Sequence, residues 1–266
     1  MRMTKAFLLV VFVPVIGFSQ LPVIESKMYS WIEPTSKGDF SLIFGSQAIF
    51  EGSAHDMEYL QMSAVVFNPE KKKYPEKKKF FNSQVPDNEE HLLIVRTGIL
   101  TIRFNDSTWS IGGGSVALLM PGQTFSLQNN TAAQCTFYRM AYRSKLPVDL
   151  VRGQSSGGSF VKDWNKIPFK PHDKGGIRNY FEHETAMSKR FEMHVTTLKE
   201  GIKSHEPHTH RAEEIVLVIE NKTEMQMDDK FYKGGTGDIY YLGSNVSHAI
   251  RNDGKGTCTY FAFQFE

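Results

Sequence analysis

The sequence contains little cysteine, little net charge and few long hydrophobic runs. Its 266 residues include only 2 cysteines, and 31 Lys and Arg balance 29 Asp and Glu to a net charge of +2. So small a charge gives no sign of the basic surface that nucleic-acid binding requires, and no nucleic-acid-binding motif is present. Beyond the first 20 residues, no apolar run is long enough to span a bilayer. We therefore expect a folded protein without a nucleic-acid partner.

The first 20 residues have the pattern of an export signal. The basic stretch "MRMTK" precedes an apolar run over residues 6–18, which is too short to cross a bilayer comfortably. Gly17 and Ser19 provide small residues at the spacing that a signal peptidase recognises. The absence of cysteine at this junction disfavours a lipoprotein anchor, and a retained membrane anchor is the alternative. We predict a signal peptide over residues 1–19 and a periplasmic or secreted mature protein, with no membrane contact after cleavage.

An internal repeat organises the rest of the chain. The stretch "CTFYRMAY" from Cys135 matches "CTYFAFQF" from Cys258, and the same offset places Gly114 on Gly237. Each copy consists of short apolar runs separated by turns rich in Gly and Asp, which is typical of β-strands. Gly 21, Phe 20 and Tyr 10, with few helical periodicities, also favour an all-β fold. Because the two cysteines occupy equivalent strands of separate units, we expect two buried free thiols rather than a disulfide.

The repeat predicts two β units joined by a linker. We expect an N-terminal unit over 20–150, a linker over 151–170 and a C-terminal unit over 171–266. The Ser/Gly cluster at 155–159 is the strongest linker signal in the chain. A slip of one residue aligns the run from Glu89 with the run from Glu213.

The stretch "SHEPHTHRAEE" carries a candidate metal site in the second unit. His208 and His210 alternate by two, so on a strand both imidazoles face the same side, and Glu214 follows four residues later. A further histidine, His248, lies late in the repeat after a turn. Three imidazoles and one carboxylate suit one divalent metal ion such as Mn, Zn, Fe or Ni, with positions open for water or substrate. We expect the neighbouring His205 at the rim of the site.

These motifs resemble those of the cupins, in which His-x-His, a Glu and a distant His hold a metal inside a β-barrel. The second motif reads "GDIYYLGSNVSHAIRN", with Gly243 and Asn245 where Pro and Gly are usual. Neither departure involves a ligand. The resemblance implies two tandem cupin barrels of the double-stranded β-helix or jelly-roll type, with the metal in the C-terminal one.

The first copy of the repeat lacks the ligands. Depending on the slip, His208 corresponds to Gln84 or Val85, His210 to Pro86 or Asp87, and His248 to Phe125. Glu90 is the nearest match for Glu214, with His91 beside it. We therefore predict a degenerate N-terminal barrel without metal.

A predicted strand before the metal motif carries candidate catalytic residues. In "KRFEMHVTTL" one face holds Arg190, Glu192 and His194, and the other face is apolar. If the polar face points into the barrel, Arg190 could bind a carboxylate while Glu192 or His194 moves a proton. The alternative places these three residues at the surface. Other possible lining residues are Tyr240, Tyr241 and Gln264.

The degenerate-then-active arrangement resembles the ureidoglycine aminohydrolase group of bicupins over residues 40–266. That group's ligand pattern differs from this chain at three of four positions, so its substrate is not transferred. With its three-His-plus-acid site and its export signal, the chain also resembles cupins that process sugar acids. We therefore predict a metal-dependent isomerase or hydrolase that acts on a small carboxylate, such as an unsaturated uronate from polysaccharide degradation. Ureidoglycine-type C–N hydrolysis, Fe(II)-dependent oxygen chemistry, non-catalytic binding of a carbohydrate or small acid, and a storage role remain alternatives, and a homodimer stays open.

Overall fold

A computed structural model of the chain describes residues 21–34, 44–69 and 80–266. The expected signal peptide, residues 1–19, lies outside them. Strands are the dominant elements of the described residues, which also contain one short α-helix, α1 (Leu150–Ser155), and one 3-10 helix, η1 (Trp164–Lys166). This confirms the predicted all-β class. Within the same residues, no helix has the length and apolar character needed to span a bilayer.

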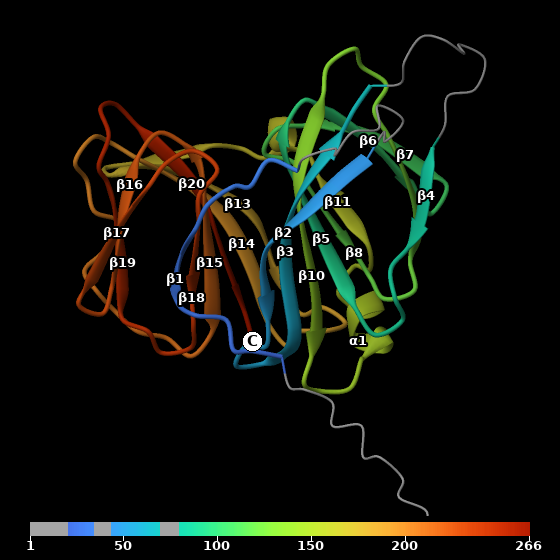
Figure 1. The fold of residues 1–266 in the computed structure, drawn as a ribbon, viewed down its shortest axis with the longest axis horizontal. Helices are drawn as coiled ribbons and strands as arrows, with labels where there is room; N and C mark the ends of the chain where they lie inside the picture. Colours follow the sequence, from blue (N-terminus) through green and yellow to red (C-terminus); the bar gives the residue numbers. More distant parts are fainter. Residues whose placement is uncertain (1–20, 35–43, 70–79) are drawn as a thin grey trace, which may run out of the picture.

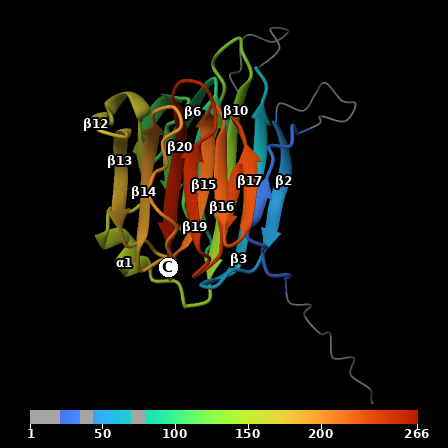
Figure 2. The ribbon, with the colours of Figure 1, turned by 90° about the vertical axis from the view of Figure 1, so that its left-hand side faces the viewer.

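Two sheets form the C-terminal barrel, and both appear in Figure 2. The larger sheet has the order β1 (Lys27–Tyr29), β18 (Ile239–Leu242), β15 (Glu213–Glu220), β20 (Cys258–Phe265), β14 (Phe191–Leu198), β13 (Gly175–His183) and β12 (Lys170–His172). The smaller sheet has the order β17 (Lys230–Gly234), β16 (Thr223–Met227) and β19 (His248–Asn252).

Two further sheets form the N-terminal barrel on the other side of the molecule (Figure 1). The larger sheet has the order β11 (Phe160–Lys162), β8 (Val116–Leu119), β5 (Glu90–Thr97), β10 (Cys135–Ser144), β3 (Met57–Phe67) and β2 (Phe44–Gly52). The smaller sheet has the order β4 (Phe81–Gln84), β9 (Thr124–Gln128), β6 (Ile99–Phe104) and β7 (Ser107–Gly112).

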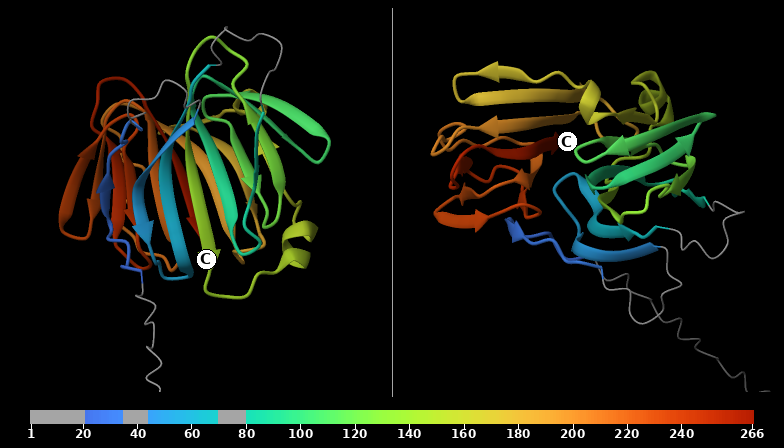
Figure 3. Two further views of the ribbon diagram at one scale, coloured as in Figure 1. Left: turned by 45° about the vertical axis from the view of Figure 1, so that its right-hand side comes forward. Right: turned by 90° about the horizontal axis from the view of Figure 1, so that it is seen from above.

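Strands of the two large sheets are apolar on both faces because each face packs against a different core. On β15, Ile215 and Leu217 belong to a core between the barrels, whereas Val216 and Val218 belong to the interior of the C-terminal barrel. A third core fills the N-terminal barrel. Figure 3 shows the barrels side by side, with their large sheets between them. Removing these side chains from water on both faces explains the continuous apolar runs of the sequence.

The barrels exchange their edge strands. Strand β1, from the start of the chain, pairs with β18 of the C-terminal barrel, and β11 pairs with β8 of the N-terminal barrel. The predicted linker, 151–170, therefore contains most of α1, all of β11 and η1, and one edge of a sheet, rather than a free connection. The barrels are not contiguous along the chain as 20–150 and 171–266 would be. Each exchanged strand covers an edge that would otherwise be unpaired.

The strand register corrects the alignment of the repeat. His91 pairs with Ala141 across β5 and β10, and Glu214 pairs with Gln264 across β15 and β20. Both members of the second pair lie 123 positions after those of the first, so no slip is needed. His91 rather than Glu90 is thus the counterpart of Glu214.

The partner of His248 gives a second correction. His208 forms an isolated bridge with His248, while Ser83 pairs with Phe125. Phe125 occupies the position of His248, as predicted, but Ser83 occupies the position of His208, in place of the predicted Gln84 or Val85. A serine and a phenylalanine at these positions leave the N-terminal barrel without the imidazoles of the C-terminal site. Cys135 and Cys258 are buried and free, which confirms the expected thiols.

Candidate metal centre

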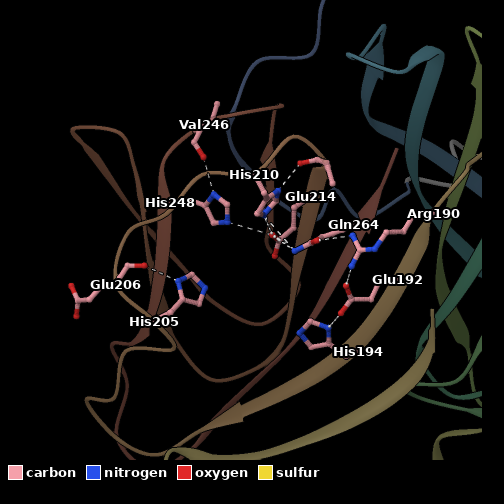
Figure 4. A network of polar contacts seen from close by, with 11 residues as sticks. Arg190, Glu192, His194, His205, Glu206, His210, Glu214, Val246, His248 and Gln264 are labelled. Atoms are coloured by element: carbon pink, nitrogen blue, oxygen red, sulfur yellow. Dashed lines mark hydrogen bonds and ion pairs between the residues drawn. The ribbon is translucent and has the colours of Figure 1, made fainter. Parts of the chain in front are cut away.

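Three histidines converge at one end of the C-terminal barrel. His208 and His210 precede β15, and His248 opens β19. One ring nitrogen from each lies within 4.8 Å of the other two. The peptide groups of His208 and His248 bond to each other in both directions, at 3.2 and 3.0 Å, and so hold the two segments together. Figure 4 shows His210 and His248 directed toward Glu214.

Glu214 supplies a carboxylate at the centre of this cluster. Its Oε2 lies 3.1 Å from Nε2 of His210 and 3.3 Å from Nε2 of His248. The side-chain amide of Gln264 donates to the same oxygen at 3.1 Å. Burial alone would raise the pKa of Glu214, but the two imidazoles outweigh burial and lower it to about 2. The carboxylate is therefore ionised and ready to act as a ligand.

The outer nitrogens of two histidines are fixed by backbone carbonyls. Nδ1 of His210 lies 2.8 Å from the carbonyl of Ala212, and Nδ1 of His248 lies 2.9 Å from that of Val246. Because a carbonyl only accepts, each Nδ1 carries a proton, and the inner Nε2 of each ring faces the cluster. Without a metal, Nε2 of His210 also carries a proton and donates it to the Glu214 carboxylate, and a bound metal ion would take the place of that proton. Burial and the neighbouring imidazoles lower the pKa of His208, which favours its neutral, ligating form.

The donor set fits a metal ion. Nε2 of His248 is buried and forms no hydrogen bond, although it contacts the Glu214 carboxylate. An unsatisfied buried nitrogen is costly unless a further partner is bound. Three imidazoles and one carboxylate are the ligands of divalent Mn, Zn, Fe or Ni sites. The structure thus brings together His208, His210, Glu214 and His248.

A cavity of about 210 Å³ opens beside this cluster inside the C-terminal barrel. Its walls include His194 and Thr196 from β14 and Tyr260 and Gln264 from β20. His205 also lines it, with its ring centroid 4.2 Å from that of His208, in agreement with the expected place near the rim. A small molecule in this cavity would contact the metal ligands and the strand residues at once.

The polar face of β14 points into the C-terminal barrel. Its apolar residues Phe191, Met193 and Val195 pack in the core between the barrels, so Glu192 and His194 face the other way. The sequence-based alternative, with the apolar face turned into this barrel, is wrong. The sequence pattern has a second buried face because the protein has two barrels in contact.

Arg190 and Glu192 are placed behind the cavity rather than in its wall. Arg190 donates to Glu182 at 3.0 Å, to Gln264 at 3.2 Å and, at short range, to Glu192. Neither Arg190 nor Glu192 is among the residues that line the cavity. With its donors engaged by protein groups, Arg190 supports the site and does not meet the expectation of a substrate clamp.

His194 is the member of the predicted trio that reaches the cavity. Its Nδ1 lies 3.1 Å from Oε1 of Glu192, which assigns the Nδ1 proton and leaves the Nε2 lone pair free. The bond to His194 lowers the pKa of Glu192, with Arg190 contributing in the same direction. Figure 4 shows the continuous path from His194 through Glu192, Arg190 and Gln264 to Glu214.

Of the other residues expected to line the cavity, only one does so. Gln264 lines the cavity, whereas Tyr240 bonds to Thr223 away from it and Tyr241 donates to Glu213 between the barrels. Thr196 and Tyr260 line the cavity but were not predicted from the sequence. Strand alternation from His194 and Gln264 would have found both.

In the metal-free protein, we expect stability to fall on acidification as Glu214 is protonated. Its folded pKa of about 2 lies below the ordinary glutamate pKa of 4.5, so its contribution is present above pH 4.5 and is lost as the pH falls toward 2. The bond to Glu214 raises the pKa of His210, so the His210 part is lost only as the pH rises through that raised value. Urea unfolding at about pH 6 and about pH 3 measures the loss.

The control is Glu214→Gln, which removes the titrating group and keeps its size. This variant should lose less stability between the two pH values than the wild type. A parallel loss in both proteins would show that other carboxylates control acid unfolding.

Comparisons with known proteins place this fold. Residues 194–263 match the family model of the cupin domain. None of the curated proteins compared matches the sequence. A protein of Pseudomonas aeruginosa described as glyoxylate-induced has a TM-score of 0.66 and 16% identity, over 96% of this chain and 93% of that chain. YlbA of E. coli has a TM-score of 0.64 and 13% identity, over 94% and 95%.

The similarity extends to a two-barrel enzyme structure. A variant of Bacillus subtilis oxalate decarboxylase has a TM-score of 0.62 and 10% identity, over 99% of this chain and 86% of that chain. At these identities the likeness shows the fold alone. The chain thus has the architecture of two tandem cupin barrels, and its cupin-domain match, residues 194–263, includes the three-histidine cluster.

Proposed function

We propose that the protein is a metal-dependent enzyme that isomerises or opens the ring of a small sugar acid, such as an unsaturated uronate. One observation carries the proposal. A carboxylate-oriented imidazole, His194 with Glu192, opens onto the same cavity as His208 and Glu214. An acid–base group beside a metal-ligand set is the arrangement that proton transfer next to a carbonyl requires.

The residues of the chain have distinct roles in this proposal. His208, His210, Glu214 and His248 hold the ion, which when bound supplies a Lewis acid for a carbonyl or hydroxyl oxygen. Nε2 of His194 takes a proton from the substrate carbon or hydroxyl and returns it to the neighbouring atom. Glu192 stabilises the resulting imidazolium, and Arg190 keeps Glu192 ionised and in place.

The proposed substrate class rests on size, polarity and location. The cavity of about 210 Å³ mixes hydroxyl, amide and imidazole groups with apolar side chains, which suits a small polar acid. The export signal that we propose for residues 1–19 would place the protein where polysaccharide fragments arrive. Ureidoglycine is made inside cells, so export favours the sugar acid over C–N hydrolysis.

The test is a substrate screen with purified protein reconstituted separately with Mn²⁺, Zn²⁺, Fe²⁺ and Ni²⁺. Unsaturated uronates are followed by loss of ultraviolet absorbance, and ureidoglycine is followed by ammonia release. We expect turnover of a uronate, and none after the metal is removed by a chelator. Ammonia release alone would favour C–N hydrolysis, and tight binding without turnover would favour a binding protein.

A further inference from the structure

The N-terminal barrel contacts the segment that carries the metal ligands and holds it in place. Glu213, next to the ligand Glu214, is 1% exposed and lies between the barrels. Its carboxylate accepts from the backbone N–H of His55 at 2.7 Å and from the Tyr241 hydroxyl at 2.5 Å. His55 belongs to the loop between β2 and β3 of the N-terminal barrel.

A second contact holds the same segment to the same loop. Arg211, between His210 and Glu214, bonds to Asp56 of the N-terminal barrel at 2.8 Å and to Glu266 at 2.9 Å. Asp56 also directs its backbone N–H toward Glu213, at 3.4 Å. One loop of the N-terminal barrel thus contacts the ligand segment at two side chains, one buried and one exposed.

The geometry of β15 links these contacts to the position of the ligand Glu214. Glu213 and Glu214 are the first residues of β15, where a strand has least support from its ladder. Neighbouring strand residues point to opposite faces, so Glu213 meets the N-terminal barrel while Glu214 meets the histidines. Fixing the Glu213 carboxylate fixes the backbone from which the Glu214 side chain extends.

We propose that Glu213 is a positioning residue through which the metal-free N-terminal barrel sets the metal affinity of the C-terminal one. This inference rests on metal binding at the four-residue cluster, which is part of the proposed function. The loop at His55 and Asp56 holds the start of β15, and the ligand Glu214 is thereby preorganised. Residues that orient metal ligands typically change metal affinity by about 10–100-fold when they are replaced.

The N-terminal barrel provides a matched control. Glu90 stands at the position equivalent to Glu213, is 0% exposed, and accepts from the Tyr142 hydroxyl at 2.6 Å and from the backbone N–H of Ala186 at 3.3 Å. Ala186 lies in the loop between β13 and β14 of the C-terminal barrel. Each barrel thus holds a strand of the other, but Glu90 neighbours His91, which belongs to no metal-ligand cluster among the residues that the structure describes. Loss of either carboxylate weakens the docking of the two barrels. Only loss of the Glu213 carboxylate also alters the metal site.

The experiment compares full-length Glu213→Gln and Glu90→Gln with the wild type. Mn²⁺ affinity is measured by calorimetric titration, and the ligand geometry is followed by the visible spectrum after Co²⁺ substitution. We expect Glu213→Gln to bind Mn²⁺ at least about tenfold more weakly, with an altered Co²⁺ spectrum. Glu90→Gln should keep the affinity within about threefold and keep the spectrum, while losing a similar amount of thermal stability.

Equal affinities for the two variants would overturn the inference and leave the metal site intact. A wild type that binds no metal would instead overturn the proposed function. Arg211→Gln provides the test if Glu213→Gln does not fold, because Arg211 is 55% exposed in its side chain and its loss leaves no buried charge. Arg211→Gln should weaken Mn²⁺ binding. An affinity equal to that of the wild type would contradict the role of these inter-barrel contacts in positioning Glu214.

Discussion

Alanine at position 210 is expected to remove nearly all metal from the purified protein. His210 presents Nε2 to the cluster, lies 3.1 Å from the Glu214 carboxylate, and has its outer nitrogen fixed by a backbone carbonyl. Without this imidazole, two histidines and one carboxylate remain, placed for a set of four donors, so the site loses one of its metal–ligand bonds. Elemental analysis should give close to one ion per chain for the wild type and less than about a tenth of that for the variant.

His91→Ala is the matched control for this result. His91, on β5, lies 3.2 Å from the carboxylate of Glu89, much as His210 lies beside Glu214, and it occupies the position equivalent to Glu214. Its barrel has Phe125 and Ser83 where the C-terminal site has imidazoles, so metal content should remain at the wild-type value. Equal metal loss in both variants would indicate a folding defect rather than the loss of a ligand.

Metal-dependent stability gives an independent measurement of the same site. An ion that binds only the folded protein stabilises it by about 2.7 kcal/mol at a free concentration 100 times the dissociation constant. Added metal should therefore raise the Tm of the wild type and of His91→Ala, and leave that of His210→Ala almost unchanged. A Tm rise of equal size in all three would place the ion elsewhere.

The convergence of the three histidines could be predicted from the sequence because their spacing places them. His208 and His210 alternate by two, and His248 lies late in the second repeat unit, after a turn. No knowledge of packing is required to see this. The all-β class followed in the same way from short apolar runs and turns. The pairing of His208 with His248 then shows how the chain joins residues that are far apart in sequence.

The exchange of edge strands could not be predicted because it depends on contacts between the two halves. The strands at 27–29 and 160–162 are too short to show an alternation of polar and apolar residues. The first pairs with the C-terminal barrel and the second with the N-terminal barrel. The Ser/Gly cluster near α1 has the composition of a linker, and composition does not report where the following strand pairs. The same limitation applies to Glu213, two of whose partners, His55 and Asp56, lie in a loop 158 and 157 positions earlier.

The orientation of β14 was undecided for a related physical reason. Alternation separates Arg190, Glu192 and His194 from the apolar set but does not say which core receives which face. A strand of a single barrel hides its apolar face inside that barrel. Here the apolar face packs against the second barrel, so the polar face is free to line the cavity.

Replacing His194 with glutamine is expected to abolish most turnover while leaving metal content unchanged. His194 is not a metal ligand, but its Nε2 is the group that we propose moves the substrate proton. Loss of such a general acid–base group typically lowers the rate by about 10²–10⁴-fold. The fall should appear in kcat with a smaller change in KM, measured on the substrate that the screen identifies and with metal content assayed in the same preparation.

Glu192→Gln separates the acid–base role from simple packing. Glutamine keeps the size of Glu192 but removes the charge that stabilises the His194 imidazolium, so the fall in kcat should be smaller than that of His194→Gln, and the acidic limb of the pH–rate profile should move. His172→Gln, on the exposed strand β12, should change neither kcat nor metal content. If His194→Gln keeps wild-type kcat, proton transfer belongs to another residue of the same wall, and the hydroxyl of Tyr260 becomes the group to replace next.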